Sequence, residues 1–421
     1  MNLLIKQAQI IDPASKFNNQ LIDILIENGQ VKKIDDEIVA KNAEVFEAEN
    51  LHIAPGFFDI GTHTCDPGFE FREDIATASK AALAGGFTGL AVLPNNNPVA
   101  DNKSAIEYIL QQGKNNLVEI FPLGSISPKA KGETLAELYD MHQNGAVGFT
   151  DGLNAMQHSG VLLRALRYVL PFDGLILQQP NDEKLSEHGV MNESEAAVKL
   201  GMFSIPQIAE AAMVQRDLFL CEYTNSRIHF FNITTEQSLD LLKNAKAKAI
   251  KVTAGISPMY LLLDDSMLED FNTNLKLMPP LRSKSEQEIL KKAIKENTLD
   301  VICSWHQPRD TEEKQVEFDH ALFGAINLQT CFAALNTAMH NEISLHQMIN
   351  LMSINPRKIL KLNVPTVAEN QTANFTLFNP SAEFIFEEKN ILSKSKNSPF
   401  IGMKLKGKIL GVIHQQQFHK N

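Results

Sequence analysis

The sequence has little cysteine, no long apolar run and no excess of positive charge. Its four cysteines lie at positions 65, 221, 303 and 331 without CxxC spacing, so no disulfide framework is expected and the pattern is typical of a reduced protein. No apolar run approaches the roughly 18 residues of a membrane span, and the N-terminal stretch is too short for a signal-peptide core. We therefore expect a cytoplasmic protein with no membrane partner.

Positive charge is scarce as well. There are 39 lysine and arginine residues against 50 aspartate and glutamate residues, for a formal net charge of −11. Charges of both signs are mixed along the chain, which argues against a nucleic-acid backbone as partner and against a polybasic membrane patch. Nucleic acid is therefore not an expected partner.

What the sequence does have is length and a repeating rhythm of strand, loop and helix. At 421 residues it can form an α/β barrel of about 250 residues with a smaller second domain. From Pro55 onward, apolar strand-like runs alternate with amphipathic helical segments, which predicts an α/β fold of the (β/α)8, or TIM-barrel, type. The eight expected strands span 57–63, 88–94, 117–124, 146–151, 174–179, 227–233, 250–257 and 299–305.

Both ends of the chain have the pattern of β structure instead. Residues 1–52 contain three strand-like runs, two of them joined at an Asn28-Gly29 hairpin turn. From about residue 365 the chain returns to β-like runs. Because the two β-rich ends flank the barrel in sequence, we expect them to pair. The predicted domains are a composite β-sandwich, 1–55 plus 365–421, and the barrel, 56–364.

The first barrel strand lies within residues 55–68, PGFFDIGTHTCDPG. Alternate side chains of a strand share a face, so Gly61, His63 and Cys65 point the same way. A metal site made by two histidines of this strand would need histidine at position 61 as well as 63. The strand therefore has the pattern of a metal site that lacks one of its ligands.

Polar side chains also stand at the ends of the other expected strands, where a (β/α)8 barrel carries its active site. They are Asn95, Asp151, Gln179, Asn232 and the pair Trp305-His306. The expected barrel mouth is polar but poor in metal ligands.

Long segments of the chain resemble the dihydroorotases of the cyclic amidohydrolase superfamily, in particular the longer type found in many bacteria. The similarity covers nearly the whole length and includes PGFFDIGTHTCDPGFEFREDI, GVMNESEAAVKLGMFSIPQIAEAAMVQRDL and PPLRSKSEQEIL. The resemblance implies a place in pyrimidine biosynthesis, where this family reversibly hydrolyses dihydroorotate to N-carbamoyl-aspartate with the help of zinc.

The first strand of the family carries D-x-H-x-H-x-R, with two zinc-binding histidines and an arginine that holds the substrate carboxylate. Here those three positions hold Gly61, His63 and Cys65, so one histidine and the arginine are replaced. The family's substrate asparagine in P-N-T matches Asn95, and a metal-ligand aspartate matches Asp151; both are kept.

Four further family positions are replaced. Two histidine ligands fall on Gln179 and Asn232, and the asparagine that precedes P-P-L-R falls on Met278. The general-base aspartate falls on Trp305, with His306 kept beside it. A neutral amide binds zinc poorly, and an indole donates a proton but accepts none. The replacements therefore affect the metal, the proton shuttle and the substrate anchor together.

These losses matter because the family's ring opening needs a metal to generate hydroxide and a carboxylate to move a proton. Catalytic zinc usually keeps about three protein ligands, so we expect no cofactor and no intact catalytic group. The remnants are His63 and Asp151 for the metal, and Asn95, Cys65, Met278 and His306 for the substrate.

Three functional hypotheses follow. The first is a non-catalytic structural or regulatory partner, as are the dihydroorotase-like chains that assemble with aspartate carbamoyltransferase in some bacteria; a homodimer is also expected. The second is an active dihydroorotase with a mononuclear zinc site built on His63 and Asp151. The third is a small-molecule binding protein that uses the reshaped barrel mouth. A mouth plugged by Trp305 would argue against this third hypothesis.

Overall fold

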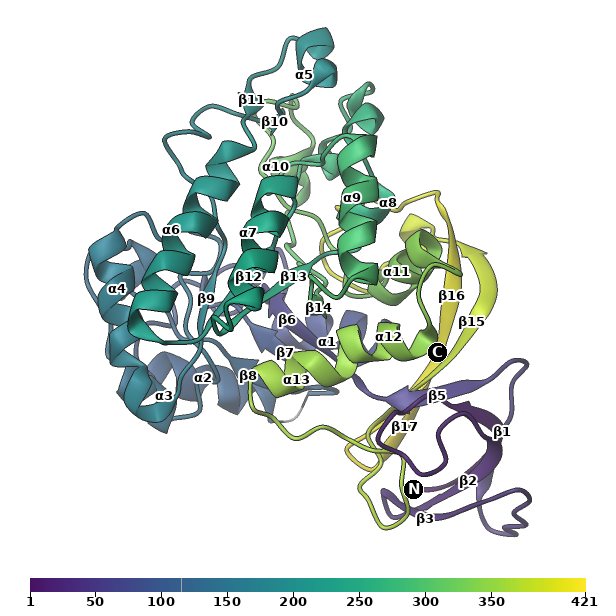
Figure 1. Ribbon diagram of the computed structural model, residues 1–421. Coiled ribbons are helices and arrows are strands. Elements are labelled where there is room, and N and C mark those ends of the chain that lie inside the picture. The colour runs from purple at the N-terminus through teal and green to yellow at the C-terminus, as the bar shows by residue number, and fades with distance from the viewer. Residues whose placement is uncertain (115) are drawn as a thin grey trace.

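The computed structural model describes residues 1–114 and 116–421. Its centre is a nearly closed barrel of parallel strands, surrounded by helices (Figure 1). One arc of the barrel has the order β6-β7-β8 and the other has the order β14-β13-β12-β9. These strands are β6 Phe57–Thr62, β7 Phe87–Val92, β8 Glu119–Pro122, β9 Ile176–Gln178, β12 Ile228–Asn232, β13 Val252–Ile256 and β14 Val301–Ile302.

The two arcs meet at a fourth position that is barely a strand. Phe149 forms isolated parallel bridges to Gly124 on one side and to Ile176 on the other. On the opposite side of the barrel, the backbone N–H of His63 donates to the carbonyl of His306 at 3.0 Å. The expected order of eight strands is therefore confirmed, although the expected strand 146–151 forms only isolated bridges, at Phe149, and a few further backbone hydrogen bonds, such as that from the N–H of Val147 to the carbonyl of Pro122.

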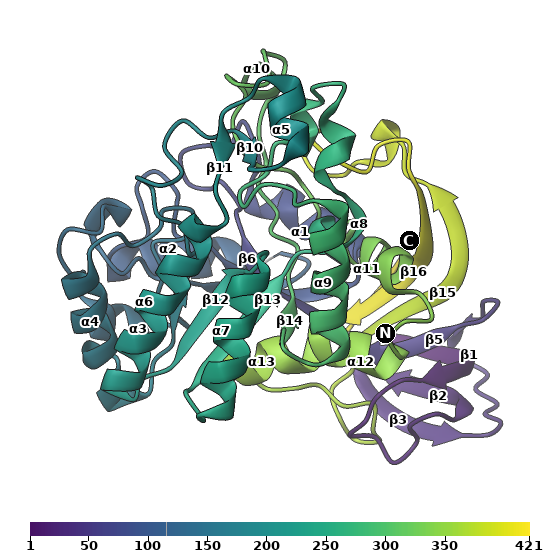
Figure 2. The ribbon, with the colours of Figure 1, turned by 45° about the horizontal axis from the view of Figure 1, so that its top comes forward.

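Helices alternate with these strands and form the outer layer (Figures 1 and 2). Their starts carry the expected capping residues; Asp74 with Thr77 and Ser283 with Glu286 both form capping boxes. The longer helices are α1 Ile75–Ala84, α2 Lys103–Gly113, α4 Ser159–Tyr168, α6 Ile208–Thr224, α7 Glu236–Ala247, α9 Lys284–Lys295 and α11 Cys331–Met339. Shorter ones are α3 Leu138–Gln143, α5 Glu195–Leu200, α8 Met259–Leu262, α10 Thr311–Lys314, α12 Leu345–Ile349 and α13 Asn355–Ile359.

Both ends of the chain contribute to one further sheet, of order β17-β16-β15-β5-β1-β2-β3, with β4 paired to β1. The two ends join where β5 and β15 run antiparallel, with Ile53 opposite Leu377. Figure 2 shows both termini in this part of the molecule. Its strands are β1 Asn2–Ile10, β2 Leu21–Glu27, β3 Gln30–Asp35, β4 Glu44–Phe46, β5 His52–Pro55, β15 Phe375–Ile385, β16 Lys404–His414 and β17 Gln417–Lys420.

This terminal sheet has an apolar core of its own. Alternate residues of its strands, such as Leu3 and Ile5 or Phe375 and Leu377, are fully buried in one cluster. The sheet and the barrel together make the fold expected from the sequence, a TIM barrel with a β-sandwich domain. A small two-stranded pair, β10 Met191–Asn192 with β11 Ser204–Ile205, lies apart from both.

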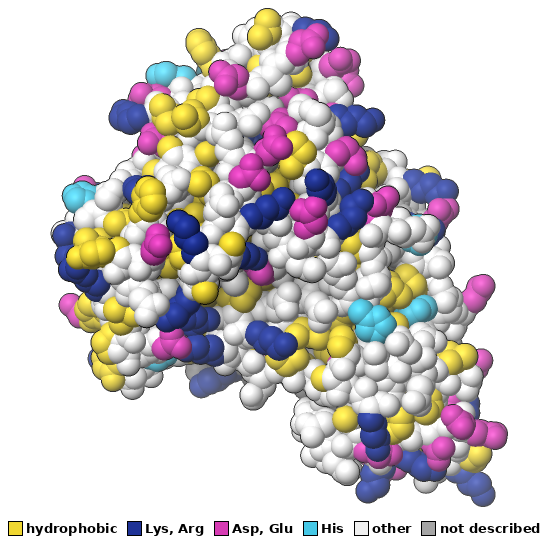
Figure 3. All heavy atoms as spheres, in the orientation of Figure 1, with side chains coloured by type: hydrophobic (Ala, Val, Ile, Leu, Met, Phe, Trp, Pro, Cys, Tyr) yellow, Lys and Arg dark blue, Asp and Glu magenta, His cyan; other side chains and the backbone are white. Residues whose placement is uncertain are grey.

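The surface shows no concentration of one charge on the face that Figure 3 presents, where lysine and arginine alternate with aspartate and glutamate. This agrees with the mixed charge pattern of the sequence. Within the described residues, no helix has the length and apolarity needed to cross a membrane.

Arg357 of α13 ties the helical layer to the first two barrel strands from within the core. It is 4 % exposed, and its guanidinium donates to the carbonyl of Gly56 at 2.6 Å and to the hydroxyl of Thr88 at 2.9 Å. Burial lowers the pKa of Arg357 to about 9. Hydrogen bonds from a charged group are worth roughly twice neutral ones, so these bonds hold the start of the barrel in place.

We expect Arg357→Met to destabilise the fold by roughly 3 kcal/mol, because it removes the guanidinium hydrogen bonds to the Gly56 carbonyl and the Thr88 hydroxyl, and bonds from a charged group are worth about 1.5–3 kcal/mol. Urea denaturation followed by circular dichroism gives the free energy of unfolding. The control is Lys358→Met, since Lys358 is the exposed neighbour on the same helix and such surface changes stay within about 0.5 kcal/mol. Equal stabilities of the two variants would contradict this role.

Candidate functional site

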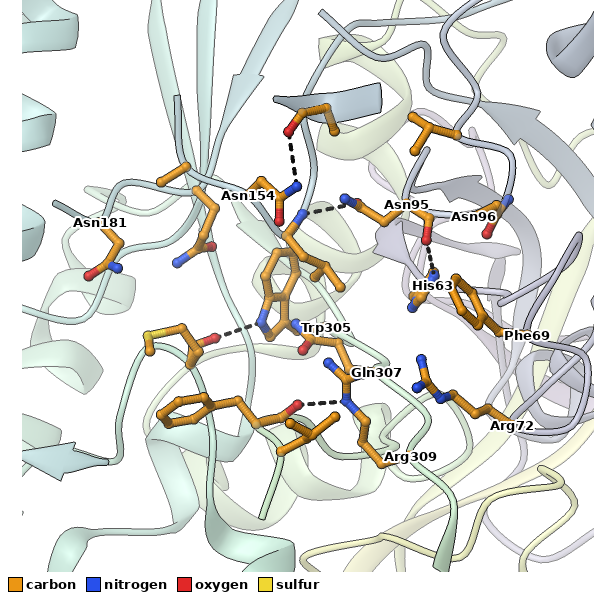
Figure 4. A pocket seen from close by; sticks show the side chains of 18 of the residues that line it. His63, Phe69, Arg72, Asn95, Asn96, Asn154, Asn181, Trp305, Gln307 and Arg309 are labelled. Carbon is orange, nitrogen blue, oxygen red and sulfur yellow. Dashed lines mark hydrogen bonds between the residues drawn. The ribbon is translucent and has the colours of Figure 1, made fainter. Parts of the chain in front are cut away.

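A cavity of about 590 Å³ opens at the carboxyl ends of the barrel strands (Figure 4). Five of the side chains predicted from the sequence line it: His63, Asn95, Gln179, Met278 and Trp305. The structure therefore brings the ends of several strands together at one mouth, as the barrel fold requires. Because the cavity is open, Trp305 narrows the mouth without filling it.

The other predicted positions lie outside the cavity wall. Cys65, Asp151, Asn232 and His306 are all buried, and none lines this cavity. Burial raises the pKa of the Cys65 thiol to about 12, so it stays protonated at neutral pH.

Gly61 and Trp305 fit together sterically. Gly61 has a φ of +103°, and a Cβ atom placed on it would lie 3.2 Å from two ring atoms of Trp305 and 3.3 Å from Phe231. The Trp305 ring packs against Phe231 with centroids 5.2 Å apart, and its Nε1–H donates to the carbonyl of Met278 at 2.9 Å. The indole thus occupies the space into which any side chain at position 61 would extend.

His63 is a neutral, hydrogen-bonded histidine. Its Nε2–H donates to the carbonyl of Asn95 at 3.1 Å, since a carbonyl can only accept. Its Nδ1 lies 3.6 Å from the sulfur of Cys65. Burial lowers the pKa of His63 to about 3. The side-chain amide of Asn95 donates to the carbonyl of Asp151 and accepts from the N–H of Leu153, both at 3.0 Å.

The carboxylate of Asp151 is turned toward a serine loop. One oxygen accepts from the Ser125 hydroxyl at 2.8 Å and from the Ser127 N–H at 2.9 Å, and the other accepts from the Ser127 hydroxyl at 2.6 Å. Burial raises the pKa of Asp151, and the bonds from Ser127 oppose that rise. These bonds satisfy the buried carboxylate without a cation, and Asp151 fixes the loop around Ser125–Ser127.

The two amides predicted at the mouth, Gln179 and Asn232, differ from each other. Asn232 accepts from the N–H of Ser257 at 2.7 Å and from the thiol of Cys303 at 3.7 Å, so it is part of the buried framework. Gln179 is 3 % exposed, and neither its amide nitrogen nor its amide oxygen has a hydrogen-bond partner among the described residues. Only Gln179 of the two faces the cavity.

His306 belongs to a separate buried cluster behind the strand end. Its Nδ1 accepts from the N–H groups of Asn327 and Leu328, at 3.2 and 3.4 Å. Its Nε2 then carries the proton and lies 3.5 Å from the Glu73 carboxylate. His306 therefore anchors the loop after β14 and does not reach the mouth.

Sequence reasoning missed several polar residues of the cavity wall, among them Arg72, Gln307 and Arg309. Gln307 and Arg309 follow the eighth strand by only a few residues. A search that included the loop after each strand, and not only its last residues, would have found them. Figure 4 shows Arg72 and Arg309 on the same side of the cavity, with Gln307 beside Arg309.

A family model described as Dihydro-orotase-like matches residues 51–238, and a model described as Amidohydrolase family matches residues 183–415. The dihydroorotase of Acetivibrio thermocellus is 37% identical over 410 residues, 97% of this chain and 96% of the relative. The chain belongs to the dihydroorotase family. Its dihydroorotase relatives also include that of Geobacter sulfurreducens, 39% identical over 97% of this chain and 96% of the relative.

Solved structures agree with the fold of this dihydroorotase-family chain. The L-hydantoinase (dihydropyrimidinase) of Arthrobacter aurescens superposes with a TM-score of 0.86 over 99% of this chain and 95% of that one, at 20% identity. A dihydropyrimidinase from Brevibacillus agri gives a TM-score of 0.84, also at 20% identity, over 99% and 95% of the two chains. At this identity the likeness concerns the fold.

The dihydroorotase family implies a metal at the mouth, and the residues present do not fit one. Among the described residues, no group of three or more histidine, cysteine, aspartate or glutamate side chains is placed to hold a metal ion. The Asp151 carboxylate accepts its hydrogen bonds from Ser125 and Ser127, and the Trp305 indole lies in the space beside Gly61. Catalytic zinc sites usually have about three protein ligands, so this donor set falls short.

We expect Gly61→His to destabilise the protein by roughly 2 kcal/mol more than Gly402→His, because only the first side chain must displace the Trp305 ring. Gly402 is a matched control, since its φ is +80° and nothing lies within 4 Å of its added Cβ. Free energies of unfolding from urea denaturation measure both. Repeating the pair in a Trp305→Ala background should shrink the difference; an unchanged difference would show that the indole is not the obstacle.

Proposed function

We propose that this chain is a non-catalytic member of the dihydroorotase family that acts as a structural or regulatory partner in pyrimidine biosynthesis. The observation that carries the proposal is the placement of Trp305. Its indole stands at the family's general-base position and closes the space above Gly61, so one side chain removes the proton acceptor and blocks a metal ligand. The preserved barrel and terminal sheet support a role for the scaffold itself.

The runner-up is an active dihydroorotase with an unusual mononuclear zinc site. It would have to use His63 and Asp151, and both are otherwise engaged. Asp151 accepts three hydrogen bonds from Ser125 and Ser127, and the Nε2–H of His63 donates to the Asn95 carbonyl. Recruiting Asp151 to a metal would leave those buried donors unpaired, which costs about 1–3 kcal/mol for each group.

The direct test is hydrolysis of dihydroorotate by the purified chain with added zinc chloride. We expect no N-carbamoyl-aspartate above the level formed in protein-free buffer, because no carboxylate stands where the proton must be moved. The matched control is His63→Gln. Activity that is equal in both proteins comes from a contaminating enzyme, whereas activity that His63→Gln abolishes would contradict the proposal.

For the partner role we propose a cytoplasmic homodimer that assembles with aspartate carbamoyltransferase. Support comes from the family resemblance and from the retained fold. Size-exclusion chromatography with light scattering should give twice the chain mass of 46.8 kDa for the protein alone. Mixing it with the aspartate carbamoyltransferase of the same organism should give a larger, co-eluting species; separate elution at micromolar concentrations would contradict this partner.

A further inference from the structure

Two lysines of this chain are buried without a carboxylate partner. Lys276 is 2 % exposed and Lys314 is 5 % exposed, and among the described residues no carboxylate oxygen lies within 4.0 Å of either Nζ atom. A buried ammonium group is normally paired with an opposite charge, because taking a lone charge out of water is costly. The two amines are therefore unusual, and their hydrogen-bond partners are backbone carbonyls.

Lys276 contacts two carbonyls and two aromatic rings. Its Nζ donates to the carbonyls of Phe318 and Asp319, at 2.8 and 3.0 Å. The same atom lies 4.9 Å from the ring centre of Phe323 and 5.5 Å from that of Phe318, and the face of such a ring attracts a positive charge. Burial lowers the pKa of Lys276 to about 8, and the Asp319 carboxylate opposes that fall. The rings give Lys276 some means of keeping its proton.

Lys314 has two carbonyl partners. Its Nζ donates to the carbonyls of Thr273 and Leu322, both at 2.8 Å. A neutral amine has two N–H groups, which these two acceptors satisfy. An ammonium group has a third N–H, for which the described chain offers Lys314 no further hydrogen-bond acceptor. The surroundings of Lys314 thus fit the neutral amine.

Two of the charged groups that act on Lys314 are positive. Arg309 and Lys276 disfavour a proton on its amine, and Glu313 favours one. Burial has the largest effect, and together these causes lower the pKa of Lys314 to about 7. Near neutral pH the Lys314 amine is therefore close to the point at which it gains or loses its proton.

The bonds of the two lysines hold residues 314–324, which run along the wall of the mouth. Leu322 and Phe323 line the cavity. Beyond Lys314, where α10 ends, this segment contains no helix or strand, and most of its side chains are exposed. A segment with few buried contacts opens at low cost, so the two amines provide much of its attachment to the barrel.

We propose that Lys276 and Lys314 form a proton-sensitive clasp that holds residues 314–324 against the mouth. The clasp is closed while the Lys314 amine is neutral and its two N–H groups meet two carbonyls. Proton uptake by Lys314 leaves an unpaired N–H and a buried charge near Arg309, and the segment opens so that the ammonium group reaches water. This device goes beyond the proposed function and stands whether or not the mouth is catalytic.

The direction of the pH dependence follows from the closed and open states. In the closed segment the pKa of Lys314 is about 7, and in the open segment it returns to about 10.4, the value of a solvated lysine. Because the open state binds the proton more tightly, opening becomes easier as the pH falls. Its equilibrium constant rises up to about 10-fold per pH unit between about pH 10 and about pH 7, and levels off below that. Lys276 acts in the same direction.

Hydrogen exchange of the full chain, measured by mass spectrometry at about pH 7 and about pH 8.5, tests the clasp. Dividing the exchange rate of the unfolded peptide by the measured rate removes the intrinsic effect of pH and gives a protection factor. We expect the protection factor of residues 314–324 to be about 10-fold or more lower at the lower pH. The reference is α7 (Glu236–Ala247), whose protection should be the same at both.

Lys314→Gln should remove most of this pH dependence, since its amide offers two N–H groups and takes up no proton. Lys314→Met should lower the protection of the segment at both pH values, because it offers no donor. The matched control is Lys80→Met, since Lys80 is exposed on α1 and should leave the protection factors and their pH dependence unchanged.

If neither Lys314 variant folds, acrylamide quenching of the unaltered chain still decides. Trp305 is the single tryptophan and lines the cavity together with Phe323, so its fluorescence reports the opening of the segment. We expect stronger quenching at the lower of the two pH values.

Equal protection of residues 314–324 at both pH values, lower protection at the higher pH, or unchanged quenching overturns the clasp. An equal loss of protection in α7 would also overturn it, because the whole fold and not this segment would then respond to pH. A folded Lys314→Gln variant that keeps the full pH dependence overturns the role of Lys314.

Discussion

The contact between the Trp305 indole and the backbone at Gly61 is the constraint on which the rest of the mouth depends. The ring needs the space that a side chain at position 61 would use, and it is held there by Phe231 and by the Met278 carbonyl. A histidine at 61 and an indole at 305 are therefore mutually exclusive in this packing. Gly61 and Trp305 therefore depend on each other, so a single substitution at either position is not expected to create a metal site.

The polar side chains around this contact form hydrogen bonds that hold the loops of the barrel mouth. Asp151 binds the serine loop, Asn95 joins the loops after two strands, and Asn232 holds the backbone at Ser257. Each satisfies buried donors or acceptors at short distances, which stabilises the barrel rim. Gln179 differs from them, because neither atom of its side-chain amide has a hydrogen-bond partner among the described residues.

Much of the fold followed from hydrophobic periodicity, because strand and helix periods are local properties of the sequence. The eight strands and the pairing of the two ends were predicted in this way. The weakness of the fourth strand was not predicted. Residues 146–151 form only isolated bridges, at Phe149, and how well a segment pairs depends on its neighbouring strands. The sequence likewise showed that Gly61 and Trp305 were unusual, but their mutual packing and the serine partners of Asp151 join residues far apart in the chain.

Elemental analysis of the chain after equilibrium dialysis against micromolar zinc, beside the His63→Gln variant, tests most directly whether the mouth has ceased to be a metal site. The account predicts well below one zinc ion per chain, with no difference between the two proteins, because catalytic zinc needs about three protein ligands and the described residues offer no such group. One zinc ion per chain that is lost in His63→Gln would contradict it.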